Sequence, residues 1–129
     1  MDIEFRNGLL FTSMEITFRG MTKMVDNIVI DTGAAETLIS PDIVEEIGVI
    51  AALTDRISSF YGVGGSLHNF FSKEVDKIRL GKIDIQNTKL DFSVIDPAGD
   101  INGLLGLDLL MEIGAVIDLK KLTMIVNSR

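Results

Sequence analysis

Apolar residues in this chain either alternate with polar ones or form short runs, and both patterns are typical of β-strands. Residues 14–18 alternate as a half-buried strand does, whereas residues 24–30 end in a continuous apolar run. An Asn-Gly pair within residues 3–11 suits a tight turn between two strands. Further strands are predicted at 75–80 and 90–95, joined by a turn near Gly81, and at two places within 115–126. The pattern predicts a mainly β chain.

Two stretches carry helix signals instead. Ser40 suits an N-cap, Pro41 the first helical position, and Gly48 the position after the end of a helix. Residues 107–113, closed by a glycine, predict a second short helix. From Arg56 onward, β-branched and aromatic residues are broken by the glycines of segment 62–65, which predicts a hairpin.

Length and composition limit the possibilities. A chain of 129 residues with 47% hydrophobic residues suits one globular domain, residues 1–129. The absence of cysteine excludes a disulfide framework, and no apolar run reaches the length of a membrane span. The first residues show no signal-peptide pattern, so we expect a soluble, cytoplasmic protein without a membrane partner. The net charge of −7 argues against non-specific nucleic-acid binding.

The stretch 27–40 holds the strongest candidate for chemistry. An apolar strand runs directly into Asp31, Thr32 and Gly33 before the sequence turns apolar again. An ionised carboxylate at the end of a buried strand is costly, so Asp31 must be solvated, paired or used. Gly33 removes a side chain where another group could approach closely.

Three segments together resemble the aspartic proteases. Val29-Ile30-Asp31-Thr32-Gly33-Ala34 resembles the catalytic signature, in which two hydrophobic residues precede Asp-Thr-Gly. Residues 102–110 (Asn-Gly-Leu-Leu-Gly-Leu-Asp-Leu-Leu) resemble the second signature, in which two hydrophobic residues and a glycine lead into a short helix. Between them, residues 61–66 (Tyr-Gly-Val-Gly-Gly-Ser) are similar to the glycine-rich tip of the retroviral protease flap. The order of the three segments is that of the family.

The Asp-Thr-Gly pattern occurs once, whereas pepsin-type enzymes carry two lobes in one chain. The resemblance is therefore to the single-lobe, retropepsin-like branch, including the retroviral-protease-like domain of the ubiquitin-shuttle DNA-damage-inducible proteins and small bacterial relatives. It covers residues 27–126. It implies a closed retropepsin-like β-barrel with a glycine-rich flap hairpin and two short helices.

The resemblance also implies roles for individual residues. Asp31 would be catalytic, Thr32 would reach across to the partner's loop, and Gly33 would leave room for substrate. The substrate-binding residues that it implies are Ala34, Gly62, Val63, Gly64 and Gly65. The residues that it implies behind the catalytic loop are Leu104, Leu105 and Gly106.

One carboxylate cannot perform this chemistry alone. Peptide hydrolysis without a metal or a nucleophile needs one group to take a proton from water and another to give one to the carbonyl oxygen. Two carboxyl groups about 3 Å apart do both, because they share a single proton. We therefore expect a homodimer in which Asp31 meets its symmetry mate, with the strands after Ala115 as the natural dimer edge. We expect no metal and no cofactor, and an extended peptide or protein as substrate.

The chain also departs from the retroviral pattern. Retroviral enzymes follow their signature with two aspartates, the first of which pairs with an arginine after the second-signature glycine. Here the corresponding positions hold Ala35, Glu36 and Leu107. The subsite shape and the dimer contacts are therefore expected to differ from the viral ones.

Simpler interpretations stay open. Asp31 alone could form an ordinary turn, segment 62–65 an ordinary hairpin, and Leu104 and Leu105 plain core. A Ser-His-Asp triad would have to recruit His68, the single histidine, which falls in the returning strand of the predicted flap. For the whole protein, we expect an aspartic endopeptidase, and the alternative is a catalytically weak peptide-binding or scaffold domain with the same fold. The complete Asp-Thr-Gly favours the enzyme.

Overall fold

The computed structural model describes residues 1–61 and 67–126, with side chains except at 58–61 and 67–68. Its helical segments are α1 (Pro41–Val44), the 3₁₀ turn η1 (Glu45–Ile47) and α2 (Leu107–Glu112). Its strands are β1 (Glu4–Arg6), β2 (Leu9–Phe18), β3 (Met21–Ile30), β4 (Leu38–Ile39), β5 (Arg56–Tyr61), β6 (Leu67–Leu80), β7 (Ile83–Phe92), β8 (Gly103–Leu105), β9 (Val116–Asp118) and β10 (Thr123–Ile125).

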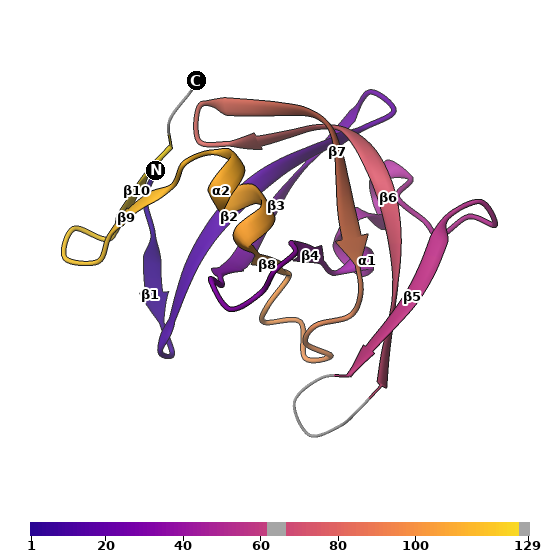
Figure 1. Ribbon diagram of the computed structural model, residues 1–129, viewed down its shortest axis with the longest axis horizontal. Coiled ribbons are helices and arrows are strands. Elements are labelled where there is room, and N and C mark those ends of the chain that lie inside the picture. The colour runs from indigo at the N-terminus through magenta and orange to yellow at the C-terminus, as the bar shows by residue number, and fades with distance from the viewer. Residues whose placement is uncertain (62–66, 127–129) are drawn as a thin grey trace.

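The central feature is a closed barrel (Figure 1). Within the described part of the chain it contains six strands, in the order β2-β3-β8-β4-β7-β6 and back to β2. Neighbouring strands are antiparallel except for the pairs β3–β8 and β4–β7, which are parallel. The short strands β4 and β8 thus close the gap between two long hairpins. The predicted mainly β barrel with two short helices is confirmed.

The alternation in β2 becomes the inner wall of this barrel. Met14, Ile16 and Phe18 are buried, while the residues between them are half-buried. Side chains of successive strand residues point to opposite faces, so every second residue reaches the core. The residues after the Asn-Gly turn and residues 14–18, which the sequence predicted as parts of separate strands, form one continuous strand, β2, with a bulge between Thr12 and Met14. The extra residue of the bulge is accommodated without ending the ladder of hydrogen bonds. Asn7 and Gly8 both have positive φ, 51° and 78°, as the tight turn before β2 requires.

Both predicted hairpins have paired strands. β5 pairs antiparallel with β6, with Tyr61 opposite Leu67 and Phe60 opposite His68. The predicted flap residues Gly62, Val63, Gly64 and Gly65 lie outside the described residues, so their role stays a prediction. The second hairpin turns at Gly81 as predicted, but its return strand spans 83–92 instead of 90–95. Residues 83–89 of this strand were missed because most of their side chains are polar and exposed, so the sequence shows little of the apolar alternation by which a strand is recognised.

The first predicted helix is shorter and differently capped than expected. One α-helical turn passes into η1, and Gly48, with φ of 90°, ends it as predicted. The expected side-chain cap by Ser40 is wrong: Ser40 makes no such bond, and its carbonyl accepts the Ile43 N–H instead. Pro41 has no N–H and the helix has a single turn, so few free donors need a cap. The second helix, α2, lies where residues 107–113 predicted it.

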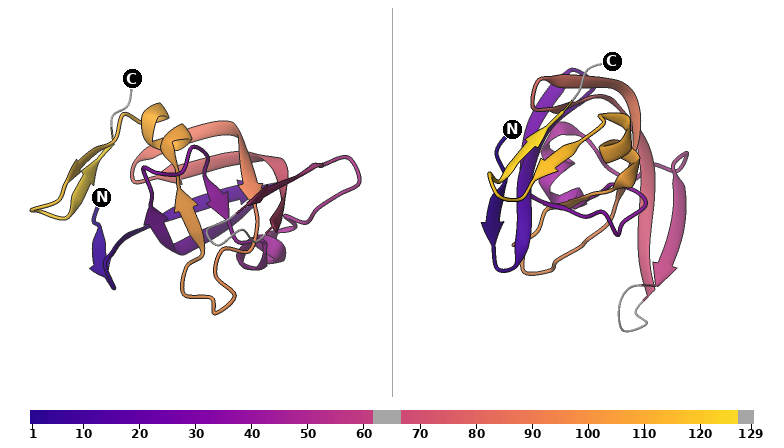
Figure 2. Two further views of the ribbon diagram at one scale, coloured as in Figure 1. Left: turned by 60° about the horizontal axis from the view of Figure 1, so that its bottom comes forward. Right: turned by 60° about the vertical axis from the view of Figure 1, so that its left-hand side comes forward.

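The remaining strands lie beside the N-terminus. β9 and β10 form a separate two-stranded sheet, and Ile3 and Asp2 pair with Leu122 and Thr123. Figure 2 shows this sheet and the N-terminus on one side of the barrel and the β5–β6 hairpin on the opposite side. Among residues 1–61 and 67–126, no helix has the length and apolar character needed to cross a membrane.

Candidate active site

Asp31 is the first residue after β3, where the strand leaves the barrel wall. Its backbone N–H donates to the carbonyl of Leu105 at 3.0 Å, which extends the parallel β3–β8 pairing by one hydrogen bond. The N–H of Gly33 donates to Asp31 Oδ1 at 2.9 Å, and the N–H of Ala34 donates to the Asp31 carbonyl at 3.2 Å. Asp31 as a residue is half-buried, and Thr32 and Gly33 are exposed. The three predicted catalytic residues therefore form one compact turn, which with the residues up to Thr37 we call the Asp31 loop.

The start of α2 holds the far side of the Asp31 loop. The N–H groups of Leu107 and Asp108 donate to the carbonyls of Ala34 and Ala35, at 2.8 and 3.1 Å. A Cβ at Gly106 would lie 2.6 Å from the backbone carbon of Glu36 and 2.9 Å from the Ala34 oxygen. The two segments can therefore cross at this distance only because residue 106 is glycine. Of the residues predicted to support the loop, Leu105 and Gly106 contact it directly, whereas Leu104 pairs with Leu38 of β4 just beyond it.

Thr37 and Asp108 fix the end of the loop with side chains. The Thr37 hydroxyl donates to Asp108 Oδ1 at 2.7 Å, and the Thr37 N–H donates to Oδ2 at 3.0 Å. The same hydroxyl accepts the N–H of Gly106 at 3.0 Å. Thr37 is 1% exposed and its bond with the Gly106 N–H is buried, whereas the two bonds to the exposed Asp108 are partly buried. Sequence reasoning missed this brace, although a hydroxyl inside an apolar run and an acid in the first turn of a helix were signals for it.

A cavity of about 350 Å³ adjoins the Asp31 loop. Its apolar lining comes from Ala34, Leu38, Phe70 and Leu104, which belong to four different segments of the chain. The parallel pairing of β4 with β7 and the antiparallel pairing of β4 with β8 bring these segments together. Of these residues, Ala34 was predicted to bind substrate and Leu104 to support the loop. Leu38 and Phe70 were missed because only the strand pairing places them here.

Two carboxyl groups also line this cavity, Glu36 and Asp91. Asp91 is 4% exposed, and its Oδ1 accepts the hydroxyl of Ser72 at 2.6 Å and lies 3.8 Å from the Lys89 ammonium. A hydrogen bond to Asp91 raises the pKa of Glu36, and the negative charge of Asp91 raises it further. The two carboxyl groups thus act as a linked pair. Nothing in the local sequence around Asp91 indicated this arrangement.

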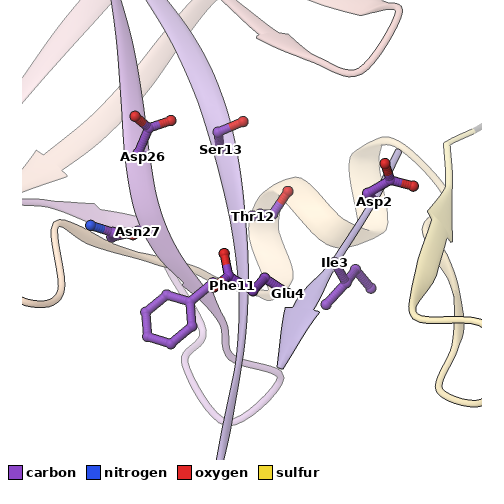
Figure 3. A pocket seen from close by; sticks show the side chains of 8 residues that line it. All are labelled: Asp2, Ile3, Glu4, Phe11, Thr12, Ser13, Asp26 and Asn27. Carbon is purple, nitrogen blue, oxygen red and sulfur yellow. The ribbon is translucent and has the colours of Figure 1, made fainter. Parts of the chain in front are cut away.

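The larger cavity, about 480 Å³, lies elsewhere. It is formed by the N-terminal residues, β2 and β3, and Figure 3 shows Asp2, Glu4 and Asp26 around it. It contains no residue of the Asp31 loop. Over the described ranges, no group of three or more His, Cys, Asp or Glu side chains is placed to hold a metal ion. We therefore assign the candidate site to the cavity of about 350 Å³, which is lined by Ala34, Ala35 and Glu36 of the Asp31 loop.

Comparison with solved structures confirms the resemblance to retropepsin-like proteases. A retropepsin-like aspartic protease from Rickettsia conorii superimposes with a TM-score of 0.68 at 18% identity, over 95% of this chain and 86% of that chain. EIAV protease in complex with the inhibitor HBY-793 gives 0.63 at 21% identity, over 90% and 98%. The retroviral protease-like domain of Ddi1 from Leishmania major gives 0.62 at 15% identity, over 94% and 90%. At these identities, the likeness shows a shared fold.

The sequence places the chain in a family as well. No curated protein matches it in sequence. A family model described as "gag-polyprotein putative aspartyl protease" matches residues 20–112, a range that runs from the start of β3 to the end of α2. This range includes the Asp31 loop, the cavity beside it and the helix that braces the loop. Because the match spans well over half of the chain, the protein belongs to this gag-polyprotein aspartyl protease family.

Proposed function

We propose that the protein is an aspartic endopeptidase that works as a homodimer, with Asp31 of each chain forming a shared pair of carboxyl groups. The observation that carries this proposal is the fixation of Asp31. Two hydrogen bonds hold the backbone of Asp31 at the end of a barrel strand, one from the Gly33 N–H holds its carboxylate, and the loop that carries it lines a cavity. Catalytic groups need such pre-organised positions, because a misplaced proton donor or acceptor loses most of its effect.

The proposed chemistry uses the two aspartates in complementary protonation states. One carboxylate accepts a proton from water as the water attacks the peptide carbonyl, while the protonated partner donates to the carbonyl oxygen. The roles then reverse, and the leaving amine receives a proton. Ala34 and the apolar side chains of the neighbouring cavity would bind the extended substrate beside this pair.

Exposed apolar residues support the proposed dimer. Phe5, Val116, Leu119 and Ile125 are large and exposed, and they belong to β1 and to the β9–β10 region on one side of the barrel. Val116 and Ile125 lie opposite each other in the β9–β10 pairing, so these two exposed side chains share one face of that sheet. Neighbouring exposed apolar residues mark an interaction site more often than isolated ones do. This surface includes the strands after Ala115 that the sequence suggested as the dimer edge.

Peptide cleavage tests the proposal directly. The purified protein should cleave members of a fluorogenic peptide library, and a pepstatin-type inhibitor should block cleavage. Asp31→Asn should abolish cleavage while its circular dichroism spectrum and melting temperature stay close to those of the parent. The amide has nearly the same shape, but it cannot accept the proton.

The alternative is a peptide-binding domain that uses the same cavity without cleaving. Peptide binding by the parent without any cleavage between about pH 2 and 7, a range that includes the pH at which an aspartic dyad shares one proton, would favour that alternative. Cleavage at the parental rate by Asp31→Asn, after removal of contaminating protease, would show that the assignment of Asp31 is wrong.

A further inference from the structure

The cavity beside the Asp31 loop has walls of two kinds. Ala34, Leu38, Phe70 and Leu104 give it an apolar lining, while Glu36 and Asp91 contribute carboxyl groups. Glu36 is exposed and Asp91 is buried, so the pair extends from the solvent into the wall. A purely apolar side chain would cover these carboxyl groups without satisfying them, which costs free energy.

The negative charge of Glu36 and Asp91, when both are ionised, is only partly balanced by neighbouring positive charge. Among the described residues, the ion pair with Asp91 comes from Lys89, whose side chain is 60% exposed and lies 3.8 Å away. Ser72 supplies a neutral hydrogen bond to the same oxygen, Asp91 Oδ1. Two further charged groups act on Glu36: Lys89 of β7 favours its ionised form, and Asp108 of α2 disfavours it. Two ionised carboxylates with one partly solvated ammonium leave an excess of one negative charge.

A long basic side chain has the matching chemistry. Lysine and arginine carry an apolar stem that packs along hydrophobic walls and a cationic end that needs charged or polar partners. In this cavity the stem would contact the apolar walls while the cation met the carboxyl pair. Charge-assisted hydrogen bonds of this kind are about twice as strong as neutral ones.

We propose that Glu36 and Asp91 determine specificity by binding a lysine or arginine side chain of the peptide substrate in the cavity beside the Asp31 loop. This inference rests on the proposed function for its substrate, but it concerns which peptide is chosen and not how the bond is cleaved. Glu36 and Asp91 are specificity-determining residues and not catalytic ones.

The preference for a basic side chain should depend on pH. At low pH, Glu36 is protonated and shares its proton with Asp91, so the pair carries at most one negative charge. As the pH rises through the raised pKa of Glu36, the second charge appears and binding of a cation becomes stronger. Preference for lysine should therefore be stronger above the raised pKa of Glu36 than below it.

Matched peptides provide the test. In a cleaved parent peptide, each position from three before to three after the scissile bond is occupied in turn by lysine or by norleucine, which has a similar stem and no charge. At one position, the full-length protein at pH 7.5 should give a kcat/KM for lysine about tenfold above that for norleucine, the effect of one charge-assisted hydrogen bond. Glu36→Gln and Asp91→Asn should each reduce this ratio several-fold. Asp26→Asn removes the same charge outside the cavity and should leave the ratio unchanged.

A binding measurement separates this inference from the proposed function. The same peptide pairs are titrated into Asp31→Asn protein, and the lysine peptide should bind more tightly there as well. If lysine is preferred in binding while the parent cleaves nothing, the inference stands and the proposed function fails. If peptides are cleaved but lysine has no advantage at any position, or if Glu36→Gln and Asp91→Asn leave its advantage intact, the inference is wrong and the protease proposal stands.

Discussion

Thr37 makes three hydrogen bonds in a small space. Its hydroxyl donates to Asp108 and accepts from the Gly106 N–H, and its backbone N–H donates to Asp108. The β3–β8 pairing holds the beginning of the Asp31 loop, and this brace holds its end. A single threonine therefore connects the loop, β8 and α2.

Replacing Thr37 with valine keeps the size of the side chain and removes the hydroxyl. We expect Thr37→Val to lower the free energy of unfolding by roughly 1–3 kcal/mol, because the buried N–H of Gly106 loses its acceptor and Asp108 loses a donor. Peptide cleavage should fall mainly through kcat, since the loop carrying Asp31 becomes less fixed. Urea denaturation and steady-state kinetics measure the two effects.

Thr37→Ser is the matched control, because it retains the hydroxyl and loses one methyl group. It should keep most of the stability and activity that valine loses. Equal losses in the serine and valine variants would show that packing of the methyl group, and not the hydrogen bonds, is what matters at this position.

The candidate catalytic turn could be predicted from sequence because its signal is local: Asp31, Thr32 and Gly33 adjoin one another and form one turn. Asp91 could not be predicted in this way. Its place beside Glu36 depends on the parallel pairing of β4 with β7, in which Leu38 lies opposite Asp91. The β4 strand has two residues, too few for any periodic pattern, and its position is set by its neighbours β7 and β8.

Two glycines of the site differ in their surroundings: Gly106 lies where α2 crosses the Asp31 loop, and Gly33 lies within the loop itself. A Cβ at Gly106 would meet backbone atoms as close as 2.6 Å, whereas a Cβ at Gly33 would meet a side-chain oxygen of Asp31 at 3.1 Å. Gly106→Ala should therefore destabilise the fold by roughly 1–3 kcal/mol, since backbone segments must move apart. Gly33→Ala should leave the melting temperature closer to that of the parent but reduce cleavage. Thermal unfolding that ranks the two variants in the opposite order would contradict this interpretation.

An ion pair connects the segment before β5 to the middle of β6. Lys73 Nζ lies 2.7 Å from Asp55 Oδ2, and both side chains are 11% exposed. The hydrogen bond to Lys73, followed by that from the Ala52 N–H, lowers the pKa of Asp55 below its ordinary value of 3.8. A lowered pKa in the folded state means that ionised Asp55 stabilises the fold above the unfolded pKa, and that this contribution disappears as the pH falls through the folded pKa.

We therefore expect Asp55→Asn to lower stability by roughly 1–3 kcal/mol at pH 7, because Lys73 is left without its carboxylate. The difference between parent and variant should shrink below about pH 4 and vanish at lower pH. Urea midpoints between pH 2 and pH 7 measure it, with Asp42→Asn on the surface of α1 as the control. A gap that stays constant across this range would show that the charge of Asp55 is not the cause.

At the scale of the whole molecule, the proposed shared site makes activity depend on assembly. Specific activity should fall when the protein is diluted below the dissociation constant of the dimer, because each chain supplies one Asp31. Mixing parent chains with Asp31→Asn chains and allowing subunits to exchange should reduce activity by more than the dilution of parent chains alone. Mixed dimers contain a single Asp31 and should be inactive.

Analytical ultracentrifugation at the concentrations of the assay provides the check. A monomer that keeps full specific activity at nanomolar concentration would exclude a shared site. The predicted cytoplasmic location is a separate question, and fractionation of the source cells would test it.

The parallel pairing of β3 with β8 has a consequence for how the protein is made. Ribosomes release the N-terminal part of a chain first, so β3 and the Asp31 loop emerge before β8 and α2 have been synthesised. Until then, the Leu105 carbonyl that accepts from Asp31 and the N–H groups that bind Ala34 and Ala35 do not yet exist. A nascent chain therefore carries Asp31 without the backbone that positions it, and it gains that support only after residues 105–108 have been translated.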